Sequence, residues 1–146
     1  MNNKVLRCEG FSIAVAEGWD DITETLDDAD APLTIADPTS GVGALQFSPA
    51  IYKGGRLPQV GPQDLSELLE EFASKQDWDA PFDRSTYPGE VAIEGVSFQV
   101  GDDFIRMWYA SDGKNVMLAT YVCDWNCRDQ ELSEREMAVR SIQFDE

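Results

Sequence analysis

One hairpin pattern constrains the fold of this chain more than any other feature of its sequence. Two alternating apolar stretches, residues 104–110 and 115–122, flank the tetrapeptide Ser111-Asp112-Gly113-Lys114. The Asp-Gly pair supplies the positive φ angles that a tight hairpin turn needs. The sequence therefore predicts two long antiparallel strands, and with them an antiparallel sheet in place of a doubly wound parallel one.

The N-terminal half carries the alternating patterns of further short strands. These predicted strands cover residues 11–15, 22–26, 33–35 and 44–51. Cys8 falls within an expected first strand, where a small thiol is ordinarily packed. Later in the chain, residues 91–93 and 96–100 flank Glu94-Gly95, which we interpret as a tight turn between two strands.

Two segments carry helical periodicity. Residues 62–76 have an i, i+3, i+4, i+7, i+8 stripe that predicts one buried face. The stripe consists of Leu65, Leu68, Leu69, Phe72 and Ala73. A second helix is expected over residues 129–140, starting either at Asp129 or with a capping box formed by Ser133 and Glu136. Its inward-facing residues would be Leu132, Val139 and Ile142.

The order of these elements predicts an α+β fold, in which a curved antiparallel β-sheet is packed with two α-helices. With 146 residues, of which 42% are apolar, the chain has enough material for a core, and we expect a single domain over residues 1–146. Trp19, Trp108 and Phe104 sit in strand patterns, so we expect them in that core.

The charge balance is the feature that says most about function. The chain has 28 acidic residues against 11 basic ones, a formal net charge of −17, and no basic residue between positions 8 and 52. A field of that sign repels nucleic acid and anionic lipid headgroups and attracts basic surfaces. We therefore expect a basic protein as the partner, and neither nucleic acid nor a membrane.

Two groups of residues are candidates for the partner-binding surface. The first is the acidic stretch, whose carboxylates would steer a basic partner towards the chain. Its members are Asp20, Asp21, Glu24, Asp27, Asp28 and Asp30. The second group is Trp78 and Trp125, which have polar and acidic neighbours. Each is interpreted either as an interface anchor or as a cover for a sheet edge.

Catalytic and metal-binding patterns are weak in this sequence. The chain has no histidine, so it lacks the commonest general base and every Ser-His or Cys-His pair, and we expect no enzyme activity and no cofactor. The stretch 27–30 lacks the glycine and the late glutamate of a calcium loop, so we interpret it as a solvated turn and expect no metal. Cys123 and Cys127 are either reduced structural thiols or a disulfide pair.

Several short motifs resemble the PsbP-like proteins and their Ran-binding nuclear-transport relatives. They are residues 11–19 (FSIAVAEGW), 43–48 (GALQFS), 108–115 (WYASDGKN) and 140–144 (RSIQF). The family's usual proline near the first turn is replaced here by Ala16-Glu17. The resemblance implies a PsbP-like α/β/α sandwich, with a final helix running into a last strand, and a binding module instead of an enzyme.

Taken together, these patterns predict a small acidic binding protein. Our first hypothesis is an immunity protein that neutralises a cognate antibacterial toxin, as in type VI secretion. The alternatives are a chaperone or adaptor for a secreted effector, and a housekeeping assembly factor of the same fold. The N-terminal residues lack the apolar stretch of a secretion signal, so we expect a cytoplasmic protein, either a monomer or a homodimer.

Overall fold

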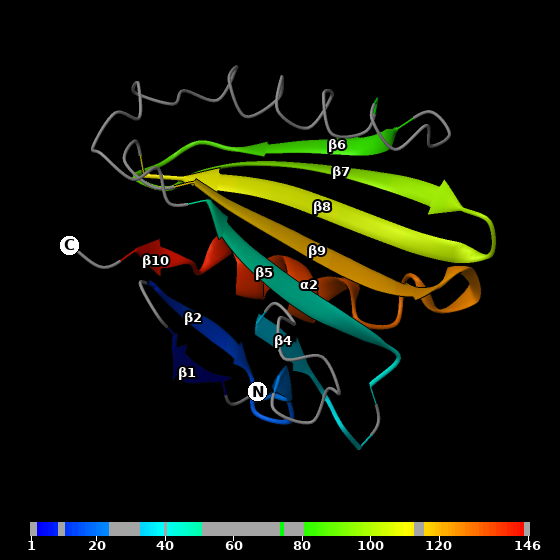
Figure 1. Ribbon diagram of the computed structural model, residues 1–146, viewed down its shortest axis with the longest axis horizontal. Helices are drawn as coiled ribbons and strands as arrows, with labels where there is room; N and C mark the ends of the chain where they lie inside the picture. Colours follow the sequence, from blue (N-terminus) through cyan, green and yellow to red (C-terminus); the bar gives the residue numbers. More distant parts are fainter. Residues whose placement is uncertain are drawn as a thin grey trace.

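Two antiparallel sheets and a C-terminal helix organise the described part of the chain. The computed structural model describes residues 3–8, 11–23, 33–39, 41–50, 74, 81–112 and 116–144. Within these residues a seven-stranded sheet has the order β3-β4-β5-β9-β8-β7-β6, and a three-stranded sheet has the order β1-β2-β10 (Figure 1). The larger sheet consists of β3 (Asp20–Asp21), β4 (Leu33–Ala36), β5 (Gly43–Ala50), β6 (Phe82–Tyr87), β7 (Ala92–Val100), β8 (Asp103–Ser111) and β9 (Val116–Asp124). The smaller sheet consists of β1 (Asn3–Arg7), β2 (Phe11–Ala16) and β10 (Gln143–Phe144).

The main core lies between one face of the larger sheet and the layer formed by β2 and helix α2 (Leu132–Arg140). That layer contributes alternate residues of β2 and the inner face of α2. Ser141 joins its two parts, because the Ser141 hydroxyl accepts from the Ala14 amide at 2.7 Å and donates to the Ala14 carbonyl at 3.2 Å. The end of the helix is thereby held beside the middle of β2.

The predicted hairpin is confirmed. Strands β8 and β9 pair antiparallel from Asp103 opposite Asp124 to Ser111 opposite Val116. The three aromatic residues expected in the core are buried there, with exposed fractions of 4% for Trp19, 0% for Trp108 and 3% for Phe104. The alternating pattern of residues 11–15 likewise corresponds to β2.

The predicted turn at Glu94-Gly95 is wrong. Both residues lie in the middle of one continuous strand, β7, where Gly95 is opposite Trp108. A Cβ atom on Gly95 would lie 2.8 Å from the Trp108 ring and 2.9 Å from the Arg106 guanidinium. The glycine is needed because two large side chains of β8 cross over the β7 backbone, and no change of chain direction is involved.

Only the first two residues of the predicted strand over 22–26 are described, and neither lies in a strand. The structure has β3 at Asp20–Asp21 instead, and Thr23 follows in a helical turn. The Asp21 carboxylate accepts from the Thr23 amide at 3.0 Å, a local bond that competes with a continuing strand. Residues 24–26 lie outside the described part. The first strand ends at Arg7, so Cys8 follows it, half-buried against the core.

Helix α2 starts later than predicted and turns a different face inward. Its N-cap is Glu131, which makes no side-chain capping bond, and Ser133 and Glu136 form no capping box. Leu132, which we expected to face inward, is 38% exposed. Val139 and Ile142 are buried as predicted. The difference arises because buried polar groups of the helix, and not its first leucine, dock its N-terminal turn.

The predicted helix over residues 62–76 lies outside the described part, apart from Ser74, which is helical and exposed. The two-helix arrangement therefore stays a prediction. In the part of the chain that the structure describes, no helix is long and apolar enough to cross a bilayer.

Substituting Gly95 by alanine tests the packing of β7. The added Cβ would overlap Trp108, Arg106 and the Ser85 hydroxyl, which lies 2.9 Å away, so unfolding should become easier by about 1–3 kcal/mol. The measurement is urea denaturation. Gly89→Ala is the matched control, since the nearest atom to its Cβ is 3.8 Å away. Equal effects of the two substitutions would contradict the assignment.

Candidate protein-binding site

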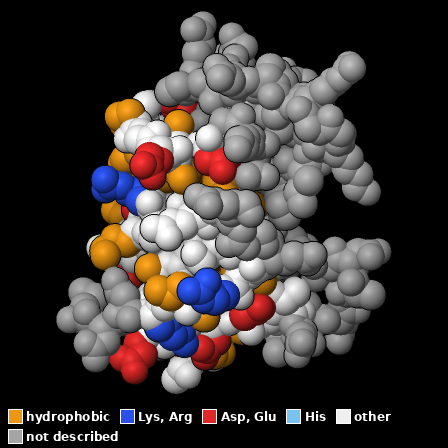
Figure 2. Space-filling view, turned by 90° about the vertical axis from the view of Figure 1, so that its left-hand side faces the viewer, with side chains coloured by type: hydrophobic (Ala, Val, Ile, Leu, Met, Phe, Trp, Pro, Cys, Tyr) orange, Lys and Arg blue, Asp and Glu red, His pale blue; other side chains and the backbone are white. Residues whose placement is uncertain are grey.

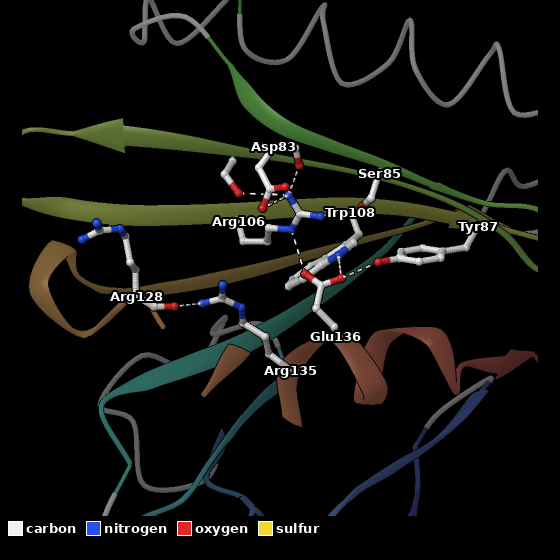
Figure 3. Close-up of polar contacts among 9 residues, drawn as sticks. Asp83, Ser85, Tyr87, Arg106, Trp108, Arg128, Arg135 and Glu136 are labelled. Carbon is white, nitrogen blue, oxygen red and sulfur yellow. Dashed lines mark hydrogen bonds and ion pairs between the residues drawn. The ribbon is translucent and has the colours of Figure 1, made fainter. Parts of the chain in front are cut away.

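A buried ion pair joins α2 to the larger sheet. Arg106 on β8 is 2% exposed, and its Nε donates to Oε1 of Glu136 on α2 at 2.9 Å. The other carboxylate oxygen, Oε2, accepts from the Tyr87 hydroxyl at 3.1 Å and from Trp108 Nε1 at 3.3 Å. Figure 3 shows these donors converging on Glu136 from the sheet. A carboxylate with this many donors is fixed in place and serves the structure.

The remaining donors of Arg106 fix the edge strand β6. Its Nη1 donates to the Ser97 hydroxyl at 2.9 Å and to the Asp83 carbonyl, and its Nη2 donates to the Ser85 hydroxyl at 2.6 Å. Asp83 has a φ of 53°, in the left-handed region that few non-glycine residues adopt, and the β6–β7 register shifts between Phe82 and Ser85. The buried arginine thus holds an irregular stretch of backbone in one conformation.

A second buried guanidinium lies beneath the start of α2. Arg135 is 2% exposed, and its guanidinium carbon lies 4.6 Å from the centre of the Phe104 ring and 4.8 Å from that of Tyr121. Its Nη1 donates to the Arg128 carbonyl at 2.7 Å, whereas its Nε has no hydrogen-bond partner (Figure 3). Burial lowers the pKa of Arg135. Two aromatic faces replace much of the water that the cation loses.

Glu131, the N-cap of α2, also fixes the start of this helix to the larger sheet. It is 8% exposed, and its Oε1 accepts from the Tyr121 hydroxyl at 2.7 Å and from the Gly43 amide at 3.1 Å. Burial, followed by the hydrogen bond to Glu131 and the charge of Glu131, raises the pKa of Tyr121. Glu131, Arg135 and Glu136 together replace the apolar stripe by which a helix usually docks.

Three aromatic rings cluster at one end of the larger sheet. Trp125 begins the short 3₁₀ helix η2 (Trp125–Cys127), and its ring centre lies 6.0 Å from Phe82 and 6.1 Å from Phe104. Arg128 stacks on Trp125 with its guanidinium carbon 4.1 Å from the ring centre. Trp125 is half-buried and covers the end of the sheet, while Phe82 is 39% exposed.

Exposed carboxylates lie at the same end of these strands but on the other face of the sheet, because Asp103 and Asp124 adjoin the inward-facing Phe104 and Cys123. The Trp125 amide donates to the Asp102 carbonyl at 2.8 Å, so the β7–β8 turn and the end of β9 lie side by side at the right of Figure 1. Asp103 and Asp124 stand directly opposite each other on β8 and β9, and all three acids are exposed. We call Asp102, Asp103 and Asp124 the sheet-end carboxylates.

The acidic residues predicted as a steering surface are only partly described. Asp20 and Asp21 are exposed on β3, at one edge of the larger sheet. Lys4 Nζ lies 2.5 Å from Asp20 Oδ1, so one of these charges is paired, and Asp21 is engaged by Thr23. The other predicted binding residues, Glu24, Asp27, Asp28, Asp30 and Trp78, lie outside the described residues. Trp125, the other described member of the predicted set, follows β9, the middle strand of the larger sheet, and is separated from Asp20 and Asp21 by strands β4 and β5.

The end of the molecule that carries β10 has mixed charge. In Figure 2 basic, acidic and apolar side chains of the described residues are interspersed there, with no uniformly acidic patch among them. The described part also contains no group of three or more potential metal ligands. Its cysteines are free thiols, with Cys123 buried and Cys8 and Cys127 half-buried.

Sequence reasoning missed Phe82, the buried network and the sheet-end carboxylates. One signal for the network was present: Arg106 interrupts the apolar alternation of Phe104 and Trp108, and a charge on a core face requires a buried partner. No such signal marks Phe82, because its exposure depends on the irregular pairing of β6.

Comparison with known proteins shows the fold. No protein-family model matches the chain, and no curated protein matches it in sequence. The solved structures that match it over 99% of its length include the Ran-binding protein Mog1p of Saccharomyces cerevisiae (TM-score 0.65, 9% identity, 96% of that chain) and the cyanobacterial PsbP of Synechocystis (TM-score 0.63, 10% identity, 92% of that chain). A Bacteroides thetaiotaomicron protein matches with a TM-score of 0.65 and 15% identity over all of this chain, which spans 50% of that protein's length. The chain therefore has the PsbP/Mog1-like fold.

Replacing Glu136 by alanine tests the buried ion pair. The substitution removes the nearer carboxylate from the buried Arg106 cation and leaves only the exposed Asp83 carboxylate, 3.7 Å from Nη1, so the free energy of unfolding should fall by about 3 kcal/mol. Chemical denaturation measures it. Glu134→Ala on the same helix is the control, and it should cost about 1 kcal/mol or less through the helix dipole. A similar small loss for both variants would show that the pair does not hold α2.

Alkaline pH should destabilise the fold through Tyr121. The folded chain retains the phenol proton above the ordinary pKa of 10.0, where the unfolded chain loses it, so this stability is present below pH 10 and is lost as the pH rises further. The raised pKa values of the Cys8 and Cys123 thiols act in the same direction from about pH 9. Urea denaturation between pH 8 and 11 measures the slope, and Tyr121→Phe should make it shallower by up to about 1.4 kcal/mol per pH unit. An unchanged slope would contradict this origin.

Proposed function

We propose that this chain is an immunity protein, which binds a basic antibacterial toxin and blocks the toxin's active-site groove. The observation that carries the proposal is the net charge of −17 together with exposed carboxylates on the strands of a closely packed sheet. Asp102, Asp103 and Asp124 make no ion pair with any residue of the described part. An acidic surface without counter-ions is complementary to the groove of an enzyme that acts on nucleic acids or nucleotides.

The charge also favours rapid capture. Electrostatic steering raises association rates to about 10⁸–10⁹ M⁻¹s⁻¹ for complementary partners at low salt. An inhibitor that protects its own cell needs such speed, because free toxin acts until it is bound. The acidic stretch that includes Asp20 and Asp21 would supply part of this long-range attraction.

Binding fits the described side chains better than catalysis does. The sequence has no histidine, and the carboxylates of the buried Glu131 and the partly buried Glu136 are occupied by donors from the sheet. Mog1p, which shares the fold, is a Ran-binding protein, so this architecture is known to present a surface to another protein. Fold alone does not identify the partner, and the toxin is inferred from charge.

Co-expression with the product of the adjacent gene tests the proposal. Toxicity should be relieved in proportion to the amount of a stoichiometric complex, and the purified chain should leave the toxin chemically unchanged. Mass spectrometry of the recovered toxin and titration of its activity are the measurements. Relief at substoichiometric amounts with an altered toxin would indicate an enzyme. A rise in the partner's level or export with its activity intact would indicate a chaperone or adaptor.

A further inference from the structure

We propose that Cys123 and Cys127 form a reversible disulfide, which locks the turn that carries Trp125 at the end of β9. The turn consists of Asp124 and the 3₁₀ helix η2. Both cysteines are free thiols in this structure, so the disulfide belongs to a second, oxidised state of the same fold. This device is independent of the proposed function, because it makes the end of the larger sheet respond to the thiol–disulfide balance around the protein.

The backbone between the two cysteines folds back on itself. Asp124 is extended, with a φ of −62° and a ψ of 142°, and the residues after it make one turn of 3₁₀ helix. The Asp124 carboxylate accepts from the Asn126 amide at 2.9 Å, which holds this reversal. Four extended residues would span about 13 Å, whereas a disulfide needs two Cα atoms within about 7 Å. The turn supplies the required return of Cys127 towards the end of β9.

Both thiols reach the same apolar cluster. Cys123 is 5% exposed on the inward face of β9, beside Tyr121 and opposite Phe104 on β8. Cys127 is half-buried and packs against the cluster that contains these residues. The charge of a Cys127 thiolate would raise the pKa of Cys123, which places the two sulfur atoms near each other. Cys8 follows β1, in the smaller sheet.

A buried cation lies beside Cys123. The guanidinium carbon of Arg135 is 4.6 Å from the centre of the Phe104 ring and 4.8 Å from that of Tyr121, and these two rings flank the thiol. The Nε of Arg135 finds no hydrogen-bond acceptor among the described residues. Burial raises the pKa of the Cys123 thiol, while the Tyr121 hydroxyl and the charge of Arg135 offset part of that rise. A thiolate formed at Cys123 therefore has a counter-charge beside it.

The oxidant that balances the reaction is a small disulfide such as glutathione disulfide. Cys127 is the more accessible thiol, so its thiolate attacks first, the S–S bond of the oxidant breaks and one glutathione leaves. The Cys123 thiolate then attacks the Cys127 sulfur and expels the second glutathione. The two protein thiols lose two electrons and two protons, and the oxidant becomes two glutathione thiols.

The disulfide would close a weakly bonded part of the turn. The Arg128 amide lies 3.4 Å from the Trp125 carbonyl, which is long for an N–H···O bond. A covalent bond between residues 123 and 127 encloses Trp125 and holds its ring against Phe82 and Phe104. Oxidation thus fixes the aromatic cover at the end of the larger sheet, and reduction allows the turn to open locally.

The test equilibrates the folded chain with glutathione buffers and counts alkylated thiols by mass spectrometry. The number of free thiols should fall from three to one. Cys123→Ser and Cys127→Ser should each abolish this paired loss, whereas the matched control, Cys8→Ser, should still lose two thiols. No disulfide across the glutathione range, a bond that includes Cys8, or a bond between two chains would each overturn the proposal.

A second measurement shows whether the fold, and not the short spacing alone, brings the thiols together. Glutathione should favour the disulfide about tenfold more in the folded chain than in the urea-unfolded chain, and the melting temperature should then rise by about 3–6 °C on oxidation. Amide exchange at residues 125–128 should slow. The comparison needs no variant, so it holds even if Cys123→Ser does not fold. Equal glutathione equilibria in both states, or a lower melting temperature after oxidation, would contradict the proposal.

Discussion

The position of α2 depends on the buried ion pair between Arg106 and Glu136. The helix buries only Arg135, Ala138 and Val139 of its nine residues, so apolar contact alone does not define how it lies on the sheet. This pair has a narrow choice of geometries, because a displaced Glu136 would leave the buried Arg106 cation with only the exposed Asp83 carboxylate, 3.7 Å from Nη1. The pair therefore sets which turn of α2 lies over β8, and through Asp83 it also sets the path of β6.

Features that depend on local pattern were predictable from the sequence. The β8–β9 hairpin and β2 follow from alternation and an Asp-Gly turn, and the fold group followed from short strand motifs. Gly95 was wrongly predicted to lie in a turn, because glycine occurs both in turns and where another side chain packs closely against the backbone. Only the position of β8 shows that Trp108 and Arg106 occupy the space where a Cβ atom of residue 95 would lie. Leu132 was misplaced because a helical stripe was assumed to be apolar, whereas Glu131 and Arg135 dock this helix.

The candidate site was less predictable, because it is assembled from segments distant in the sequence. Trp125 was interpreted either as an anchor or as a cover for the sheet, and in the structure it covers the sheet end while standing next to the exposed Phe82. In the sequence, nothing distinguishes Asp103 and Asp124 from the other acidic residues. The strand register places them directly opposite each other, and this cannot be read from the composition. Asp20 was predicted to be a free steering charge, but it is paired with Lys4, which lies on another strand.

Among the basic residues that the structure describes, Arg106 and Arg135 lie inside the fold. A shell of carboxylates makes the electrostatic potential of the interior negative, which lowers the free-energy cost of keeping these cations away from water. Added salt screens the repulsion among the surface carboxylates, and it also weakens the field that favours the interior cations. These two effects oppose each other, so the folding free energy should vary less with ionic strength than a net charge of −17 alone implies.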